Sequence, residues 1–371
     1  MSGLKKLGFL TAFLNPTLIV LGYYLGGLWN FSAFAFAYLL IPIADEIIGK
    51  DHDNISHDEI DEISNERFFN GILYVLMYIQ VALIVWGSYI ASEFLLTPIE
   101  MVGFVLSVMT FTTGGINVAH ELGHKKNKIG RFHSKLTLMT VCYMHFYIEH
   151  NQGHHVNVAT PLDPATSRKG QIFYTFWFQS VIGGWISAWN IEKRRLERAN
   201  LSLWNPIHNQ MLQYIIFPLL FLTALVTVFS ITSGAFAWLV PIFFFAQSFM
   251  AFSSLEAVNY IEHYGIQRKE ISEGRYERVN PLHSWNSNHL VSNWLLFQLQ
   301  RHSDHHAYAA RPYQVLRHFD ESPQLPFGYP VMILISLIPP LWFKIMDKRL
   351  EEWQAQALDA EHIEAVVRRT A

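Results

Sequence analysis

The positive charges of this sequence are distributed very unevenly. Three long stretches contain no lysine or arginine: residues 7–49, 68–124 and 199–267. Each is long enough for two helices that cross a bilayer, because one crossing needs about 20 residues at a rise of about 1.5 Å each. Hydrophobic residues make up 51% of the chain and charged residues only 15%, which is typical of membrane proteins. We therefore predict an all-α integral membrane protein.

The three stretches divide into six apolar segments, which we predict to be membrane spans. They cover residues 8–27, 31–48, 69–90, 98–119, 213–233 and 237–258. Six crossings place both termini on one side. The turns within the three helical hairpins carry no positive charge, so lysine and arginine gather on the side of the termini, and the positive-inside rule makes that side cytoplasmic. This predicts a six-helix bundle with a cytoplasmic cap.

Three further apolar segments lie outside the predicted spans. Residues 133–149 and 171–190 are flanked by polar motifs, and residues 331–343 are too few to cross comfortably. We expect the first two to lie in the interface or to pack beneath the cap, and the third to be re-entrant or interfacial. Two parts follow: a membrane domain over residues 1–346, and a polar C-terminal tail over residues 347–371 that could serve as a linker.

Four short segments hold nine of the 18 histidines. Their sequences are HELGH from His120, EHNQGHH from Glu149, NYIEHYG from Asn259 and QRHSDHH from Gln300. Imidazole is the commonest metal ligand, and one ion rarely takes more than about six ligands. Nine clustered donors at the cytoplasmic ends of the spans therefore predict a dinuclear metal site in a histidine-rich cap.

The spacing of two segments places their histidines on one face of a helix. His120 and His124 are four residues apart and can clamp one ion, and His302, His305 and His306 follow the same rule. HELGH also matches the HExxH pattern of zinc proteases. A zinc protease needs one more ligand, whereas seven further histidines are clustered here, so we do not favour that interpretation.

The second segment is less regular. His150 and His154 align on one face of a helix, but His155 would point about 140° away. We predict that a helix breaks at this point and that Gly153 supplies backbone freedom, so that the paired histidines face different metals. His263 in the third segment completes the set.

Carboxylates near the histidines are expected to orient the rings and to balance the charge of two divalent ions. The candidates are Glu121, Glu149, Asp163, Glu262 and Asp304. The alternative for each is an ordinary solvated acid at a membrane surface. The histidines outside the four segments are interpreted as surface, hydrogen-bonded or packing residues, some of which could support a ligand: His52, His57, His133, His145, His208, His283, His289, His318 and His362.

Composition excludes several other classes of protein. The single cysteine, Cys142, rules out disulfides, a four-thiolate zinc site, and an iron–sulfur or rubredoxin centre within this sequence. The metals must therefore be bound by nitrogen and oxygen. The net charge of −3 provides no basic field for phosphate, so no nucleic-acid partner is expected.

The words HELGHK, EHNQGHH, NYIEHYG and LQRHSDHHAY resemble the signature motifs of the membrane-bound non-haem diiron alkane 1-monooxygenases. The resemblance runs from the first span to about Phe327. It implies an enzyme of the bacterial inner membrane with two iron ions, which hydroxylates the terminal methyl of medium- to long-chain n-alkanes with O2 and electrons from a rubredoxin. The ligands it implies are His120, His124, His150, His154, His155, His263, His302, His305 and His306.

The resemblance also implies a substrate channel and an electron donor. An alkane has no polar group, so selectivity must come from the shape of an apolar channel. Large and small residues alternate on the second span, which predicts that Phe34, Ala37 and Tyr38 line it. The basic residues from Lys125 to Arg198 could bind a small acidic donor or anionic lipid headgroups. With one cysteine here, the donor must act in trans or as a fused domain absent from this sequence.

Two kinds of alternative remain. A fatty-acyl desaturase or an alkyl-aromatic hydroxylase would belong to the same metal class, since the first, second and fourth histidine motifs are common to that class. A non-catalytic metal-binding or metal-transport membrane protein would belong to another. Transport favours ligands at mid-bilayer along a path, whereas these histidines gather at one face.

Overall fold

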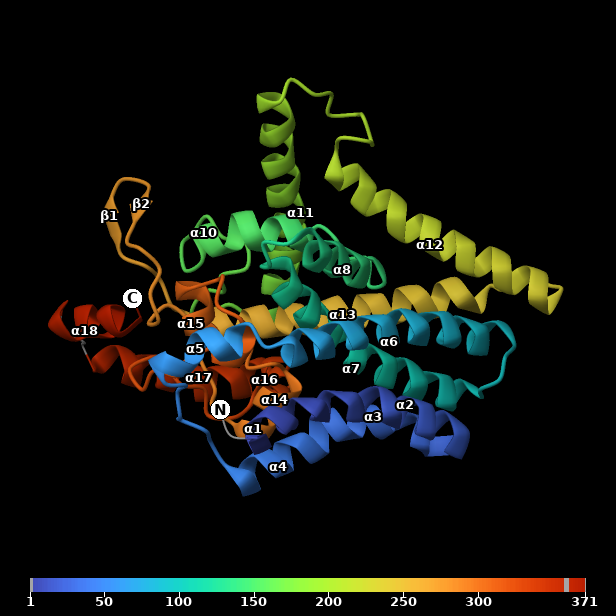
Figure 1. Ribbon diagram of the computed structural model, residues 1–371, viewed down its shortest axis with the longest axis horizontal. Coiled ribbons are helices and arrows are strands. Elements are labelled where there is room, and N and C mark those ends of the chain that lie inside the picture. The colour runs from blue at the N-terminus through green and yellow to red at the C-terminus, as the bar shows by residue number, and fades with distance from the viewer. Residues whose placement is uncertain (1–2, 357–359, 371) are drawn as a thin grey trace.

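The computed structural model, which describes residues 3–356 and 360–370, consists mainly of helices (Figure 1). Six helical segments of this part are long and apolar enough to cross a membrane, which confirms the six predicted spans. They are Gly3–Leu25, Gly27–Ile48, Arg67–Ser92 (α6), Pro98–Gly123 (α7), Gln210–Ser233 (α12) and Leu239–His263 (α13). Each extends beyond its predicted bounds at one end or both, although the first ends two residues earlier and the sixth begins two residues later than predicted.

The first two spans are chains of short helical pieces. The first comprises α1 (Gly3–Gly8), η1 (Phe9–Phe13) and α2 (Leu14–Leu25), and the second comprises η2 (Gly27–Phe31), α3 (Ser32–Ala35), η3 (Phe36–Leu40) and α4 (Ile41–Ile48). The piece η3 is a π-helical turn. Such turns are uncommon and often lie at functional sites, and this one contains two of the predicted channel residues.

The central layer of the bundle consists of α6, α7 and α13, which lie side by side in Figure 1. Helix α7 begins at a capping box, in which Thr97 and Glu100 satisfy each other's backbone amides, and Pro98 occupies its first turn. Aromatic side chains fill the space between these helices, as the stacked rings of Phe104 and Phe243 illustrate. This packing holds the ends of α7 and α13 next to each other, where two of the histidine segments begin.

The remaining elements form the cap and its connections. They are α5 (His57–Ser64), α8 (Lys128–Met139), α9 (Phe146–Glu149), η4 (His150–His154), α10 (His155–Asn157), α11 (Phe173–Arg198), β1 (Glu270–Ser272), β2 (Arg275–Tyr276), α14 (Leu290–Leu295), α15 (His302–Ala307), η5 (Tyr313–Val315), α16 (Tyr329–Ser336), α17 (Pro339–Ala355) and α18 (Ala360–Thr370). Most of them gather at the left of Figure 1, at one end of the spans. The two strands pair as a short antiparallel hairpin.

Helix α11 runs across the direction of α13 rather than along it (Figure 1). Its exposed apolar residues recur every four positions, at Tyr174, Phe178, Ile182 and Ile186. This is the pattern of a helix that lies on a membrane surface with one face in the acyl region. An interfacial position was one of the two arrangements expected for residues 171–190.

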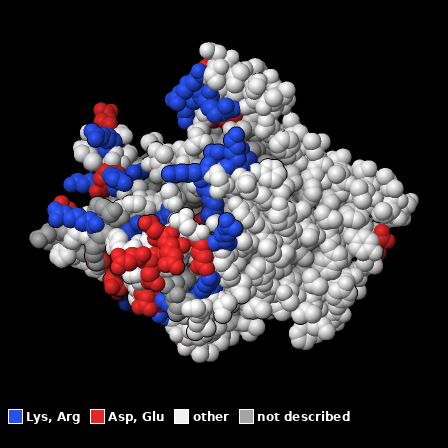
Figure 2. Space-filling view, in the orientation of Figure 1, with Lys and Arg blue, Asp and Glu red and all other residues white. Residues whose placement is uncertain are grey.

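The charged side chains gather at the cap end of the molecule. Figure 2 shows lysine and arginine over α8 and over the C-terminal part of α11, with acidic residues over α5, while the right-hand part of this face is almost without charge. This separation of charged and apolar surface is that of a protein with one end in water and its body in a bilayer.

The C-terminal part of the chain packs onto the cap. Helix α17 passes through the domain boundary proposed at residue 346, and Leu350 beyond it is fully buried in a core that includes Tyr260 and Trp342. Residues 347–355 are thus part of the packed structure. A linker role for the rest of the tail stays a prediction.

Candidate metal centre

The structure brings all nine clustered histidines together in two adjacent groups. Among the described residues, one group has five members and the other has four, and within each group the ligand atoms lie within 4.8 Å of one another. The first group is His120, His124, His150, His155 and His305, and the second is His154, His263, His302 and His306.

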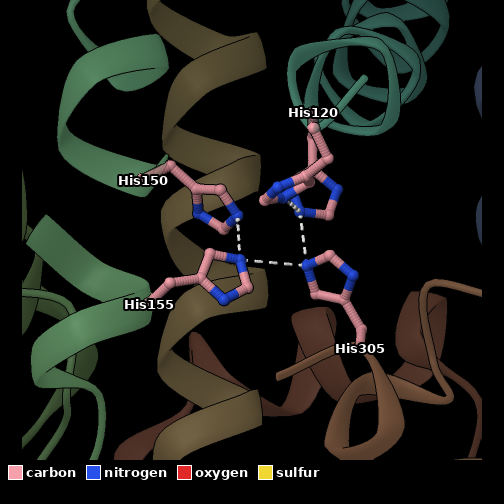
Figure 3. Close-up of side chains that lie close together, drawn as sticks. His120, His150, His155 and His305 are labelled. Atoms are coloured by element: carbon pink, nitrogen blue, oxygen red, sulfur yellow. Dashed lines mark hydrogen bonds between the residues drawn. The ribbon is translucent and has the colours of Figure 1, made fainter. Parts of the chain in front are cut away.

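Figure 3 shows how three elements contribute to the five-histidine group. His120 comes from α7, His150 and His155 from the helix that continues from α9 to α10, and His305 from α15. The Nε2 atom of His305 lies 2.9 Å from that of His120 and 3.1 Å from that of His155. The Nε2 atoms of His150 and His155 are 2.9 Å apart.

The four-histidine group has the same geometry. The Nε2 atom of His306 lies 2.8 Å from that of His302 and 3.2 Å from that of His154. His302 and His263 approach with their Nε2 atoms 3.3 Å apart. The two groups adjoin, because the ring centroids of His155 and His306 are 4.6 Å apart.

Hydrogen bonding between the rings cannot explain these short contacts. An imidazole Nε2 carries at most one proton, yet His305 and His306 each present this atom to two other Nε2 atoms. Ligands about 2.1 Å from a common ion and at right angles to each other are about 3 Å apart, which matches the observed spacing. Each group therefore has the geometry of a set of nitrogen ligands around one ion.

The second histidine segment does not break, contrary to the prediction from its spacing. Residues 146–157 form one continuous helix whose middle turn, η4, is π-helical. The wider turn places residues five apart on one face, so His150 pairs with His155, and His154 joins the other group. The expectation that the adjacent histidines face different metal positions is met by this turn rather than by a helix end.

Gly153 has a different role from the one predicted. Its φ angle is not positive, so backbone freedom is not what the position requires. A Cβ atom there would meet Oε1 of Glu149 at 2.5 Å and Oγ of Ser187 at 3.0 Å. Glycine at this position therefore allows helix η4 to approach Glu149 and α11 closely.

The fourth segment contributes to both groups. His302 and His306 are four residues apart and share one group, but His305 belongs to the other. The three rings lie close together, with centroids 4.4–5.8 Å apart, so the six-residue helix α15 supplies ligands to both groups. His120 and His124, by contrast, share one group, as their spacing predicts.

Four of the histidines outside the spans are held in their neutral form. Burial, followed by the neighbouring imidazoles, holds the pKa of His150, His302 and His306 well below the usual value. Burial also lowers the pKa of His124 to about 4. Neutral imidazole is the form that binds a metal, so these rings are ready to do so at neutral pH.

Asp163 lies where a ligand-orienting carboxylate was expected. Nδ1 of His154 donates to Oδ2 of Asp163 at 2.9 Å, and the hydroxyl of Thr166 donates to the same oxygen at 2.6 Å. Burial alone would lower the pKa of His154, but the carboxylate of Asp163 outweighs it and raises this pKa. The hydrogen bond fixes the ring so that Nε2 faces the four-histidine group.

Glu262 and Glu149 also lie against the centre. Oε2 of Glu262 is 3.1 Å from Nε2 of His302, on the side where the ring nitrogens converge. Glu149 lines a small polar cavity behind His150 and His154. Burial, together with the nearby charge of Asp163, raises the pKa of Glu149 to about 8.

The other two candidate carboxylates have different partners. Glu121 forms an ion pair with Lys125 at 3.5 Å. Asp304 is fully buried and accepts two hydrogen bonds of 2.6 Å from Arg311, with a third from the backbone of Arg317. Among the residues that the structure describes, the bonded partners of Asp304 are these arginines rather than histidine rings. Asp304 therefore anchors α15 instead of orienting a ring.

Two residues near the centre were missed by the sequence reasoning. Glu256 is a buried carboxylate inside α13, where it accepts a hydrogen bond from the Tyr143 hydroxyl at 2.7 Å. Asn117 is buried inside α7 and donates to the backbone of Leu296 at 2.6 Å. A polar residue within a membrane span is costly, and this signal could have identified both.

An apolar cavity lies among the membrane helices, next to a smaller cavity that three of the histidines line. It is lined mainly by α7 and residues 295–299, with two residues each from the first span, the second span, α13 and α16. The two from the second span are Ala37 and Tyr38. Phe34 is not among the lining residues and packs against Tyr38, with ring centroids 4.9 Å apart. The smaller cavity includes His120, His150 and His302 and shares four wall residues with the larger one: Asn117, Leu255, Val258 and Leu299.

A helical membrane bundle with two sets of buried histidines and an apolar cavity beside them defines a class, the membrane-embedded dimetal oxidoreductases. The sequence model of the fatty acid desaturase family matches residues 96–336, which contain all nine histidines. The alkane 1-monooxygenase of Acinetobacter baylyi is 41% identical over 88% of this chain and 78% of its own. The chain therefore belongs to the fatty acid desaturase family and, within it, to the alkane 1-monooxygenases.

Two other relatives support this family membership. Alkane 1-monooxygenase 2 of Alcanivorax borkumensis is 41% identical over 89% of this chain and 85% of its own. The xylene/toluene monooxygenase hydroxylase component of Pseudomonas putida is more distant, at 28% identity over 90% of this chain and 86% of its own.

Proposed function

We propose that this protein hydroxylates the terminal methyl group of medium- to long-chain n-alkanes to 1-alkanols, with O2 as oxidant and a rubredoxin as electron donor. The observation that carries the proposal is the apolar cavity that shares four wall residues with a smaller cavity lined by His120, His150 and His302. A cavity with apolar walls along its length suits a substrate without polar groups, which would enter from the bilayer.

Two iron ions fit the residues present. The donors are nine imidazoles in sets of five and four, and imidazole suits iron among other transition metals. When bound, the two irons supply the activation of O2 for insertion of one oxygen atom into a C–H bond. We assign Asp163 and Glu262 to orienting the ligands and offsetting their charge, and Glu149 to the polar side of the centre.

The cavity walls position the substrate. Leu255, Val258 and Leu299 line both the apolar cavity and the smaller cavity beside the histidines, and we assign them to guiding a chain end toward the centre. Ala37 and Tyr38 line the part nearer the second span, where the far end of the alkane would lie. The apolar walls also exclude water, which would compete with the substrate for the site.

The electron donor is proposed to dock on the basic surface over α8 and the end of α11. Each turnover consumes two electrons and two protons, because one oxygen atom of O2 enters the alcohol and the other leaves as water. Two exposed lysines follow His124: Lys126 lies on the connection, and Lys128 is the first residue of α8. A small acidic protein would be attracted to this surface and brought close to the five-histidine group.

We propose a bacterial inner membrane as the location, with both termini and the metal centre on the cytoplasmic side. The gathering of lysine and arginine at the cap end supports this orientation. A donor dissolved in the cytoplasm would then meet the basic surface directly.

The proposal is tested with the iron-loaded protein in detergent or lipid, supplied with O2 and reduced rubredoxin. We expect conversion of octane or hexadecane to the 1-alkanol, with about two iron ions per chain. Xylene and an acyl thioester are offered in parallel. Preferential oxidation of xylene or desaturation of the thioester would assign the chain to a different activity within the same metal class.

A further inference from the structure

A third set of metal-binding side chains lies outside the nine-histidine centre. Nδ1 of His52 is 3.1 Å from Nε2 of His318, and this Nε2 is 2.9 Å from Oδ1 of Asp320. Oδ1 of Asp320 is also 3.6 Å from Nδ1 of His52. Three donor atoms from two distant parts of the chain thus meet at one point, as they do in the two histidine groups.

Hydrogen bonds do not satisfy this arrangement fully. Nε2 of His318 carries at most one proton, yet it lies within bonding distance of both His52 and Asp320. If the Nε2 proton of His318 points to the carboxylate of Asp320, Nδ1 of His52 is left with only the longer contact of 3.6 Å to Oδ1 of Asp320. A cation at the meeting point would use the lone pairs of all three groups.

The buried neighbour of His318 supports the same conclusion. The side-chain nitrogen of Asn288 lies 2.6 Å from Nδ1 of His318, and its Oδ1 atom is buried without a partner among the described residues. Exchanging the amide oxygen and nitrogen places Oδ1 where Nδ1–H of His318 can donate to it, and gives up the 3.3 Å hydrogen bond from this nitrogen to Oε1 of Gln324. This leaves the lone pair of Nε2 free, and a carbonyl on the far nitrogen is the usual support of a metal-bound histidine.

The backbone around these residues is well fixed. The side chain of Asn54 accepts a hydrogen bond from the backbone amide of His318 at 2.7 Å and donates to its carbonyl at 2.9 Å. The guanidinium of Arg301 donates to the carbonyls of Asp51 and Leu316. His318 is buried, while the side chains of His52 and Asp320 are 56% and 87% exposed, so the meeting point opens to solvent.

We propose that His52, His318 and Asp320 form a third metal site, which binds a divalent ion of the zinc type. Two imidazoles and one carboxylate leave a fourth position for water, which is a usual coordination of zinc. The ion would fasten the segment after α4 to the segment after η5. Arg301, the neighbour of His302, donates hydrogen bonds to backbone carbonyls of both segments. The bound ion would therefore stabilise one wall of the four-histidine group. The inference is independent of the reaction at that centre.

The test titrates Zn²⁺ into the full-length, iron-loaded protein and measures bound zinc and iron by elemental analysis after dialysis. We expect one zinc per chain with the iron content unchanged. His52→Gln and Asp320→Asn each remove one exposed ligand and should weaken zinc binding by at least about tenfold. His57→Gln, which changes an exposed histidine on α5, is the matched control and should bind zinc as the native chain does.

A second readout reports on the two segments themselves. Zinc should slow amide exchange in residues 49–56 and 316–322 of the native protein, and this protection should be absent from the two variants. Zinc binding that is equal in the native chain and both variants, zinc taken up only as iron is lost, or absence of bound zinc would each overturn the proposal.

Discussion

Nδ1 of His154 and Oδ2 of Asp163 are 2.9 Å apart, and both side chains are almost completely buried. The hydrogen bond between them selects the tautomer of His154 and aims its Nε2 atom at the four-histidine group. Partners of this kind matter nearly as much as the ligands themselves, because a metal-bound ring must be held in one orientation.

Replacing this carboxylate should weaken metal binding. We expect Asp163→Asn to lower the affinity of the four-histidine group for iron by about 10- to 100-fold, because an amide can present a donor to Nδ1 and stabilise the wrong tautomer. Iron per chain after dialysis measures the change. Asp61→Asn, an exposed substitution on α5, should keep the native iron content. An Asp163→Asn protein with full iron would show that the hydrogen bond does not orient the ring.

The π-helical turn at the second histidine segment gives a sharper prediction. A methyl group at Gly153 would lie 2.5 Å from Oε1 of Glu149, so Gly153→Ala must displace either that side chain or the turn itself. Overpacking of this kind costs about 1–3 kcal/mol, and we expect a lower melting temperature together with a lower iron content. Gly71→Ala on α6 is the control, since a methyl group there meets nothing within 4 Å. Equal behaviour of the two variants would contradict the close-approach role of Gly153.

The spans could be predicted from the sequence because charge and hydrophobicity act locally. The absence of lysine and arginine over tens of residues suffices to locate membrane helices, and the histidine motifs alone indicate a two-metal site. The sorting of the histidines could not be predicted in the same way. It depends on a π turn that pairs His150 with His155, and on the position of α15, which supplies ligands to both groups.

Contacts between residues far apart in the chain also could not be predicted from the sequence. His52 and His318 are 266 residues apart, and spacing rules say nothing about such a pair. Asp304 lies between two clustered histidines in the sequence, but the helix turns its carboxylate away from them toward Arg311. In both cases tertiary packing, rather than local periodicity, decides which groups meet.

The pair of Asp304 and Arg311 should be important for stability. Asp304 is fully buried, so Arg311→Leu would leave its charge without its main partner, at a cost of about 3–5 kcal/mol. We expect a clear fall in the melting temperature of the detergent-solubilised protein. Arg368→Leu breaks an exposed pair with Glu364 and should have little effect, because such pairs contribute about 0–1 kcal/mol. Equal melting temperatures for the two variants would show that Asp304 finds other compensation.

Charge reversal at Lys126 and Lys128, around the start of α8, tests the docking surface. We expect Lys126→Glu combined with Lys128→Glu to raise the KM for reduced rubredoxin several-fold at low salt, and to make turnover less sensitive to added salt. Turnover driven by a small uncharged reductant should stay at the native rate. Arg275→Glu on the β1–β2 hairpin serves as the control for a general loss of positive charge. If the KM for the donor does not change in the double variant, the donor binds elsewhere.

The cavity predicts a change in chain-length preference. Ala37 is buried and lines the cavity, so Ala37→Trp should fill the space that the far end of a long alkane occupies. We expect the ratio of octanol to hexadecanol, formed from an equimolar mixture of the two alkanes, to rise at least about tenfold, since misplacing a reacting group by about 1 Å can already cost about 100-fold in rate. Leu39→Trp adds the same bulk two residues away, where the side chain is 57% exposed on the outside of the span, and should leave the ratio unchanged. A native product ratio in the Ala37→Trp protein would mean that the substrate reaches the histidines by another route.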